Sequence, residues 1–323
     1  MLPTRLYYWL KPFVPRSIRM PLLRQRARRL LAENLDTWPI NASAAVAPQG
    51  WTGWPGKKKF TFVLTHDIES RKGVEQVRQL AELEMELGFR SSFNFIPEGS
   101  YTVPPELREW LVQNGFEVGV HDLHHDGHLY ESKKAFTKHA GRINHYLKEW
   151  GAVGFRSGFM LRRLEWLHAL NVEYDASTFD TDPFEPQPDG TQQLFPFMVC
   201  NGSRQYVELP YTLPQDSTLF LLLQKKDTAI WMQKLEWIAS HGGLALVNIH
   251  PDYIDFTGDS YGFSKYPVSL IRRFLETVRD HHQGDYWHPL PRELASWYRG
   301  TAPVPVPVDR QISPASACPS PHP

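Results

Sequence analysis

The sequence predicts an α/β fold, namely a distorted (β/α)7-type barrel of parallel strands with helices on the outside. Short apolar runs alternate with longer amphipathic runs, which is typical of repeated βα units. The apolar runs supply seven strand candidates that are nearly continuous in apolar residues, as expected of a parallel sheet covered on both faces. The length of 323 residues suits one such barrel with extensions at its ends.

The expected elements follow one another in alternation along the chain. Strands are expected at residues 60–64, 92–96, 117–121, 154–156, 174–178, 206–209 and 244–249. Helices are expected at residues 74–87, 105–114, 133–150, 162–170, 228–241 and 268–281. Gly88, Gly115 and Gly151 follow three of these helices, and we expect them to end the helices in the left-handed conformation.

Composition and charge divide the sequence into three parts, and the middle part is expected to form this fold. We assign residues 1–56 to a basic N-terminal extension and linker, residues 57–299 to the barrel, and residues 300–323 to a disordered Pro-rich tail that cannot bury enough apolar area to fold. Lys and Arg together number 35, as do Asp and Glu, so we expect no nucleic-acid partner.

The N-terminal extension concentrates positive charge. Its first forty residues carry eight Lys or Arg residues against two acidic residues. Such a segment can be a solvated helix face or a strap packed on the barrel wall, a flexible arm, or a region attracted to anionic lipid or a charged glycan carrier. Proline and lysine interrupt its apolar residues, so we expect no signal peptide and no spanning helix. We expect a cytoplasmic protein, with peripheral contact to the inner membrane surface through this segment as a further expectation.

Polar, titratable residues follow at least five of the expected strands. Because the C-terminal ends of barrel strands meet on one face, where active sites lie, we expect a functional site there. These polar residues occupy segments 65–69, 121–126, 156–158, 174–182 and 248–252. The loop 179–188, rich in Asp and Pro, is expected to form one wall of a cleft.

The spacing of His121 and His125 is the strongest local signal. Two imidazoles four residues apart, on a strand end that rolls into a turn, can converge on one cation. A carboxylate from Asp67 or Glu69 completes a three-ligand site that leaves a position for water, as in catalytic rather than structural zinc sites. The alternative interpretation is a pair of surface histidines.

In these segments the sequence resembles the polysaccharide deacetylase family (the NodB-homology or carbohydrate esterase family four domain), in a divergent branch. The resemblance covers about residues 60–290 and rests on five segments in the family's order: Thr65–Glu69, His121–His125, Arg156–Gly158, Tyr174–Asp175 and Asn248–His250. Two departures stand out. The family's adjacent Asp pair is here Asp67-x-Glu69, and the proline of the third motif is absent.

The resemblance implies a metal-dependent hydrolase that removes an acyl group, with N-acetyl as the first candidate, from a carbohydrate substrate. It implies that His121, His125 and Glu69, or Asp67 in place of Glu69, hold a divalent metal, with Zn²⁺ as the first candidate. Surface polysaccharide or lipid-linked glycan metabolism is the expected context. The alternatives are a C–N hydrolase acting on a small amide or ureide, and a non-catalytic glycan-binding module with a degenerate site.

The resemblance also assigns roles to four further side chains. Asp67 is expected to act as general base, with Arg156 keeping its carboxylate ionised and oriented. His250 is expected to protonate the leaving amine, with Asp175 keeping the imidazole cationic and oriented.

Overall fold

The computed structural model describes residues 16–258 and 260–301. Its sheet has nine strands, in the order β11-β1-β2-β3-β4-β5-β7-β6 with β8 also paired to β1. The strands are β1 (Phe60–Ile68), β2 (Ser91–Phe95), β3 (Glu117–His121), β4 (Gly154–Arg156), β5 (Tyr174–Asp175), β6 (Phe197–Asn201), β7 (Arg204–Glu208), β8 (Leu244–Ile249) and β11 (Tyr286–Trp287). Strands β9 (Ile254–Asp255) and β10 (Tyr266–Pro267) pair separately.

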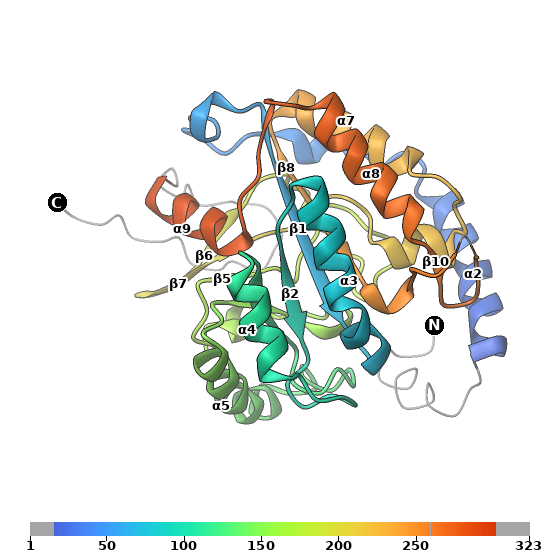
Figure 1. Ribbon diagram of the computed structural model, residues 1–323. Helices are drawn as coiled ribbons and strands as arrows, with labels where there is room; N and C mark the ends of the chain where they lie inside the picture. Colours follow the sequence, from blue (N-terminus) through green and yellow to red (C-terminus); the bar gives the residue numbers. More distant parts are fainter. Residues whose placement is uncertain (1–15, 259, 302–323) are drawn as a thin grey trace.

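Helices surround this sheet (Figure 1). They are α2 (Arg16–Glu33), α3 (Arg71–Leu87), α4 (Pro105–Gln113), α5 (Lys133–Trp150), α6 (Leu164–Leu167), α7 (Ala229–His241), α8 (Val268–His281) and α9 (Pro291–Thr301), with a π-helical segment at Ser217–Leu222. Helices α3, α5 and α8 are amphipathic and bury their apolar residues against the sheet.

The sheet curls into a nearly closed, mostly parallel barrel, which confirms the predicted fold class. Every strand pair in it is parallel except β6 with β7. Beyond β7, the backbone N–H groups of Thr212 and Leu213 both donate to the carbonyl of Leu246 in β8 at 3.0 Å, which brings the two ends of the sheet together. All nine residues of β1 are buried because both of its faces are covered.

Several elements have the bounds that the sequence predicts. Strands β3, β4 and β8 and helices α5 and α8 agree with the expected ranges. Gly88, Gly115 and Gly151 have φ values of 84°, 81° and 63°, so all three adopt the predicted left-handed conformation. Strand β1 runs on to Ile68, four residues beyond its predicted end, and therefore includes Asp67 of the candidate site.

Other elements differ from expectation. Strand β5 has two residues instead of five, because the chain turns at Ser177. The elements expected from the sequence do not include α2, β6, β11 or α9. Helix α2 contains Pro21, and β6 and β7 form a short antiparallel hairpin rather than another βα unit.

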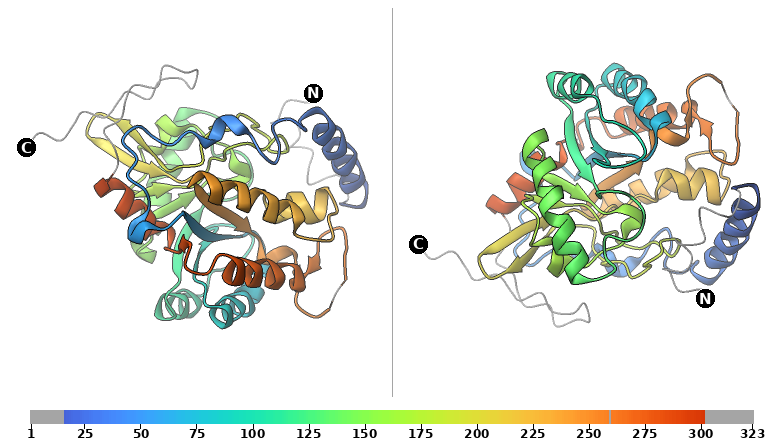
Figure 2. Two further views of the ribbon diagram at one scale, coloured as in Figure 1. Left: turned by 90° about the horizontal axis from the view of Figure 1, so that it is seen from above. Right: turned by 90° about the horizontal axis from the view of Figure 1, so that it is seen from below.

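The N-terminal helix α2 packs on the side of the barrel, beside the π-helical segment (Figure 2). Met20 and Ala27 are buried there, and Arg24 Nε donates to the carbonyl of Leu221 at 2.9 Å. Residues 16–33 of the basic segment thus form a helix that packs on the barrel, whereas a solvated helix face or a packed strap was expected. Residues 1–15 and 302–323 lie outside the described residues, and residues 300 and 301 of the predicted tail belong to α9. The domain limits at residues 56 and 299 stay predictions. Within the described part of the chain, no helix is long and apolar enough to cross a bilayer.

Candidate metal centre

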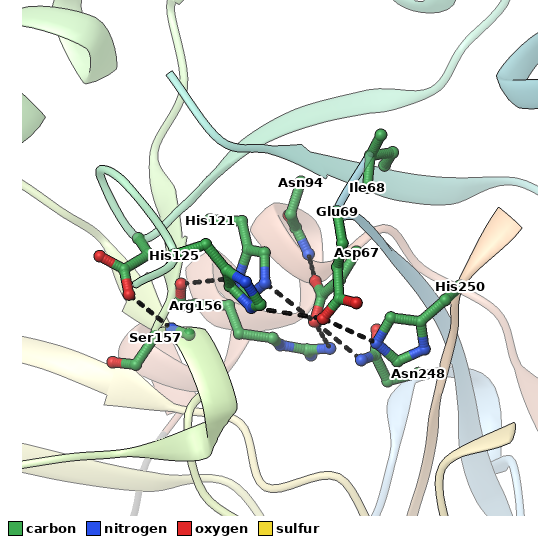
Figure 3. Close-up of polar contacts among 12 residues, drawn as sticks. Asp67, Ile68, Glu69, Asn94, His121, His125, Arg156, Ser157, Asn248 and His250 are labelled. Carbon is green, nitrogen blue, oxygen red and sulfur yellow. Dashed lines mark hydrogen bonds and ion pairs between the residues drawn. The ribbon is translucent and has the colours of Figure 1, made fainter. Parts of the chain in front are cut away.

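Strand register brings the candidate residues together at one end of the barrel. Asp67 in β1 lies opposite Asn94 in β2, and Thr65 lies opposite Asn248 in β8. His121 in β3 lies opposite Arg156 in β4. Figure 3 shows the result: Asp67 and Glu69 lie between the two histidines of β3 and its following turn on one side and His250 on the other.

Glu69, His121 and His125 form the cluster that could hold a metal ion. Each offers one ligand atom, and the three atoms lie within 4.8 Å of one another. His125 Nε2 is 3.3 Å from Glu69 Oε1. Glu69 is the more accessible of the two candidate carboxylates, because its side chain is 24% exposed whereas that of Asp67 is 3% exposed.

The tautomer of His121 is fixed by its backbone contact. Its Nδ1 lies 3.1 Å from the carbonyl of Arg156, which can only accept a hydrogen bond, so Nδ1 carries the hydrogen. The lone pair of Nε2 then faces the cluster, and this buried atom has no hydrogen-bond partner among the described residues. Burial lowers the pKa of His121, despite the opposing effect of Asp67, and favours the neutral ring that metals require. This side chain therefore fits a metal ligand.

The turn after β3 brings His125 back beside His121. Asp122 and His125 both adopt left-handed backbone conformations, with φ values of 57° and 55°. Gly158, in the segment after β4, packs directly against this turn: a Cβ at position 158 would overlap the Asp122 carboxylate and lie 2.8 Å from Cδ2 of His125. The absence of a side chain at Gly158 therefore allows His125 to occupy its place in the cluster.

Asp67 is a buried, ionised carboxylate whose two oxygens are both held by amides. Asn94 Nδ2 donates to Oδ1 at 3.0 Å, and Asn248 Nδ2 donates to Oδ2 at 2.8 Å. Arg156 Nη1 lies 3.5 Å from Oδ2. Burial alone would raise the pKa of Asp67, but electrostatic attraction to the imidazole of His121, to Arg156 and to His250 outweighs it and holds the pKa well below its ordinary value.

Arg156 is itself fixed in place. Its Nε donates to the carbonyl of Ala176 at 2.8 Å, and its Nη1 donates to Thr65 Oγ1 at 3.0 Å. The side chain is fully buried, so its charge faces Asp67 with little screening by water. Arg156 thus lies beside Asp67, and its expected role toward that carboxylate stays a prediction.

His250 is held by a carboxylate that the sequence analysis did not identify. Its Nδ1 lies 2.7 Å from Asp216 Oδ1, and its backbone N–H donates to Asp216 Oδ2 at 3.0 Å. Tyr266 Oη also donates to Oδ2, at 2.6 Å. Burial by itself lowers the pKa of His250, but Asp216 and, more weakly, Glu69 raise it to about 10. His250 is therefore an imidazolium at neutral pH, with Nε2 3.9 Å from Glu69 Oε1.

The expected contact between Asp175 and His250 is absent, and this is a correction to the sequence analysis. Asp175 accepts hydrogen bonds from the hydroxyl of Ser177 at 2.7 Å and from its backbone N–H at 3.1 Å. The short β5 explains this, since the chain turns immediately after Asp175 and the carboxylate caps that turn. Burial raises the pKa of Asp175.

Two further residues of the site carried weak sequence signals. Asn94 is the polar residue of the otherwise apolar Phe93–Phe95 stretch, a pattern that marks a side chain directed to a polar interior. Asp216 directly precedes the apolar π-helical segment Ser217–Leu222 rather than following a strand. A search restricted to strand ends therefore misses Asp216.

Comparisons with known proteins give a fold but no close relative. No protein-family model and no curated protein matches the sequence. A structure from Mycobacterium smegmatis, provisionally assigned as a polysaccharide deacetylase, matches with a TM-score of 0.63 and 16% identity, over 82% of this chain and 99% of that one. At this identity the similarity is one of fold, and it is the fold that the resemblance of the motifs implies.

Two other structures match less well. A peptidoglycan deacetylase from Bacillus subtilis gives a TM-score of 0.44 and 12% identity, over 75% of this chain and 93% of that one. A protein from Bordetella bronchiseptica, provisionally assigned as a polysaccharide deacetylase involved in O-antigen biosynthesis, gives a TM-score of 0.42 and 19% identity, over 76% of this chain and 86% of that one.

Proposed function

We propose that this protein is a metal-dependent hydrolase that removes an acyl group, with N-acetyl as the first candidate, from a carbohydrate. The observation that carries the proposal is the arrangement of charge around the Glu69, His121 and His125 cluster. Ionised Asp67 lies beside His121 of the cluster and cationic His250 lies beside Glu69, and each is held by buried partners of its own. A proton acceptor and a proton donor flanking a metal site form a set suited to amide or ester hydrolysis.

The donor set fits a divalent metal. Two imidazole nitrogens and one carboxylate oxygen are the ligands of many catalytic zinc sites, and His121 presents an Nε2 lone pair without a partner among the described residues. The geometry favours Glu69 over Asp67 as the carboxylate ligand, because both oxygens of Asp67 are already held by amides. When bound, the ion would polarise the acyl carbonyl and lower the pKa of a nearby water.

Asp67 is placed to accept the proton of the attacking water. Its carboxylate is ionised at neutral pH, and its orientation is fixed by Asn94, Asn248 and Arg156. Such fixed placement allows proton transfer without reorganisation of the side chain. The same negative charge also favours the protonated form of His250 across the cluster.

His250 is placed to protonate the leaving group. Its Nδ1–H is committed to Asp216, so the Nε2–H is the proton that can be transferred. The raised pKa keeps this proton on the ring at neutral pH until the leaving nitrogen gains basicity as the C–N bond breaks. Transfer of the proton releases the free amine, and the acyl group leaves as its acid.

We also propose that the carbohydrate is a surface polysaccharide or a lipid-linked glycan. Helix α2 supports this, because Arg26 and Arg28 are exposed on it and Leu22 is 60% exposed. Basic and apolar side chains on one helix suit attraction to an anionic lipid surface.

Metal analysis combined with a substrate panel tests the proposal. The purified protein is expected to contain about one zinc or other divalent ion per chain by elemental analysis, and His121→Ala and His125→Ala to lose it. The matched control is His145→Ala on α5, whose side chain is 69% exposed and distant from the cluster in sequence. Unchanged metal content in the His121 and His125 variants would contradict the site.

The substrate panel separates the alternatives. Acetate release from N-acetylated sugars is expected, with loss of release in the metal-free variants. Turnover of small amides or ureides alone would assign the protein to C–N hydrolases of small molecules. Glycan binding without metal or turnover would assign it to non-catalytic binding modules.

A further inference from the structure

A second polar network lies behind the candidate site, in the loop that precedes β6. The loop residues 179–192 direct three acidic side chains inward, and Asp180, Asp182 and Glu185 are all buried. The mechanism proposed above uses none of them. Buried carboxyl groups are costly unless they are paired or protonated, so their presence requires an explanation.

Hydrogen bonds connect this network to Asp67. Gln215 Nε2 donates to Glu185 Oε1 at 2.5 Å, and Gln215 Oε1 accepts from Asn248 Nδ2 at 3.2 Å. The same Asn248 amide donates to Asp67 Oδ2 at 2.8 Å. Each amide hydrogen of Asn248 is thus used, one toward Gln215 and one toward Asp67. Glu185 is therefore connected to Asp67 through the two intervening amides of Gln215 and Asn248.

Counting hydrogens shows that the network holds an additional proton. Tyr211 Oη lies 2.9 Å from Asp182 Oδ2 and 2.9 Å from Glu185 Oε1. A phenol has one hydrogen and can donate to one of these oxygens only. The second short contact becomes a linear hydrogen bond of its own when the other carboxyl group is protonated and donates to Tyr211. In this arrangement one carboxyl group is protonated and the other is ionised. The three side chains of Asp182, Tyr211 and Glu185 then share two protons, one on the phenol and one on a carboxyl group.

The surrounding charges agree with this count. Lys234 on α7 pairs with Asp180 at 2.8 Å, and so neutralises it. A second cation, Arg162 in the segment before α6, lies near Glu185. Burial, reinforced by the charge of Asp182, raises the pKa of Glu185 to about 8, and burial raises that of Asp182 to about 6. At neutral pH, Asp182 and Glu185 together thus carry about one negative charge, near Arg162.

We propose that Glu185 is a positioning residue for Asp67, and that the proton shared with Asp182 and Tyr211 keeps the Glu185–Gln215–Asn248 chain in contact with the Asp67 carboxylate. Loss of that proton leaves two carboxylates around a single phenol hydrogen. One carboxylate must then withdraw, and withdrawal of Glu185 removes the acceptor of Gln215. The inference concerning activity rests on the proposed function, whereas the coupling of Glu185 to Asn248 does not.

The coupling can be measured without any substrate. Protein labelled with ¹⁵N in Asn side chains gives an amide signal for Asn248, assigned by its disappearance in Asn248→Ser. In the parent this signal is expected to shift with a midpoint at about pH 8. In Glu185→Gln, which keeps the size of the side chain but cannot ionise, the shift is expected to vanish. Asp189→Asn, which removes an exposed carboxylate from the same loop, is expected to retain it.

A second variant tests the same coupling if Glu185→Gln fails to fold. Asp182→Asn removes the negative charge that raises the pKa of Glu185, so the midpoint of the Asn248 shift is expected to move to lower pH. An Asn248 signal that does not respond to pH, or that responds identically in the parent and in the Glu185 and Asp182 variants, would overturn the inference.

Activity gives the functional readout. If Glu185 positions Asp67, the kcat/KM of the parent falls about tenfold for each pH unit above about 8, and that of Glu185→Gln persists to higher pH. Identical alkaline limbs in the two proteins would overturn the positioning role. An Asn248 shift that depends on Glu185, in a protein without deacetylase activity, would support the coupling and contradict the proposed function.

Discussion

Asp216→Asn is the substitution that most clearly separates the observed site from the one expected from the sequence. Asparagine keeps the size of the side chain and can still accept the backbone N–H of His250, but it removes the negative charge beside the ring. The matched control is Asp175→Asn, which alters the residue that the sequence analysis placed in this role. The structure predicts that only the Asp216 variant changes the titration of His250.

The size of the effect follows from the pKa of His250. Its rise from 6.5 to about 10 corresponds to about 5 kcal/mol of preference for the protonated ring, at about 1.4 kcal/mol for each tenfold change. Without Asp216, burial remains the largest effect and lowers the pKa of His250, opposed only by the weaker attraction of Glu69 and Asp67. The ring is then neutral at pH 7 and cannot donate a proton, so kcat/KM is expected to fall by about 10²- to 10⁴-fold.

The same change has a defined effect on stability. A group whose pKa is raised by folding contributes stability that is complete below its unfolded pKa and is lost as the pH rises through its folded pKa. For His250 this contribution is complete below about pH 6.5 and is lost toward about pH 10. Asp216→Asn is therefore expected to destabilise the fold by several kcal/mol in mild acid and by much less near pH 10.

Two assays check this prediction. Proton NMR of the His250 ring gives its pKa in the parent and in the two Asp variants, and denaturant unfolding at acid and alkaline pH gives the free energy of unfolding. A His250 pKa that stays high in Asp216→Asn, or that falls as far in Asp175→Asn, would refute the assignment of Asp216 as its partner.

The remaining predictions concern other parts of the site and the N-terminal helix. Asp67→Asn is expected to retain metal by elemental analysis but to lose at least about 10²-fold in acetate release, and loss of metal would instead make Asp67 a ligand. Gly158→Ala is expected to weaken metal binding about tenfold or more, because its Cβ displaces the Asp122 carboxylate and with it the turn that carries His125. Competition with a chelator measures this, and unchanged affinity would contradict it. Arg26→Ser combined with Arg28→Ser is expected to reduce binding to anionic vesicles by about 1 kcal/mol per arginine in a sedimentation assay, and equal binding would dismiss contact with the membrane.

The placement of residues that follow the regular strand–helix pattern of the barrel could be predicted from the sequence. Asp67, His121, Arg156 and His250 lie in or directly after strands, and the parallel register that places them together follows from the alternation of strands and helices. Glu69 lies one residue beyond β1 and joins the histidines, as one of the two alternatives expected.

Residues outside this pattern could not be placed. The partner of His250 depends on where Asp216 lies in three dimensions, and the π-helical segment that follows it has no recognisable signal in the sequence. Asp175 carries the expected type of side chain at the expected strand, but the early end of β5 redirects it to Ser177. The acidic loop at 179–188 was expected at the wall of a cleft, whereas its Asp180 and Asp182 are buried. Asp180 pairs with Lys234 of α7 and Asp182 contacts Tyr211, and both contacts depend on tertiary packing.

The central claim is that Glu69, His121 and His125 share one metal ion, and anomalous X-ray diffraction at the zinc absorption edge tests it most directly. Crystals grown with Zn²⁺ are expected to show one strong anomalous peak in contact with the Glu69 carboxylate and with Nε2 of both histidines. Absence of a peak among these three side chains, or a peak elsewhere on the protein alone, would contradict the account.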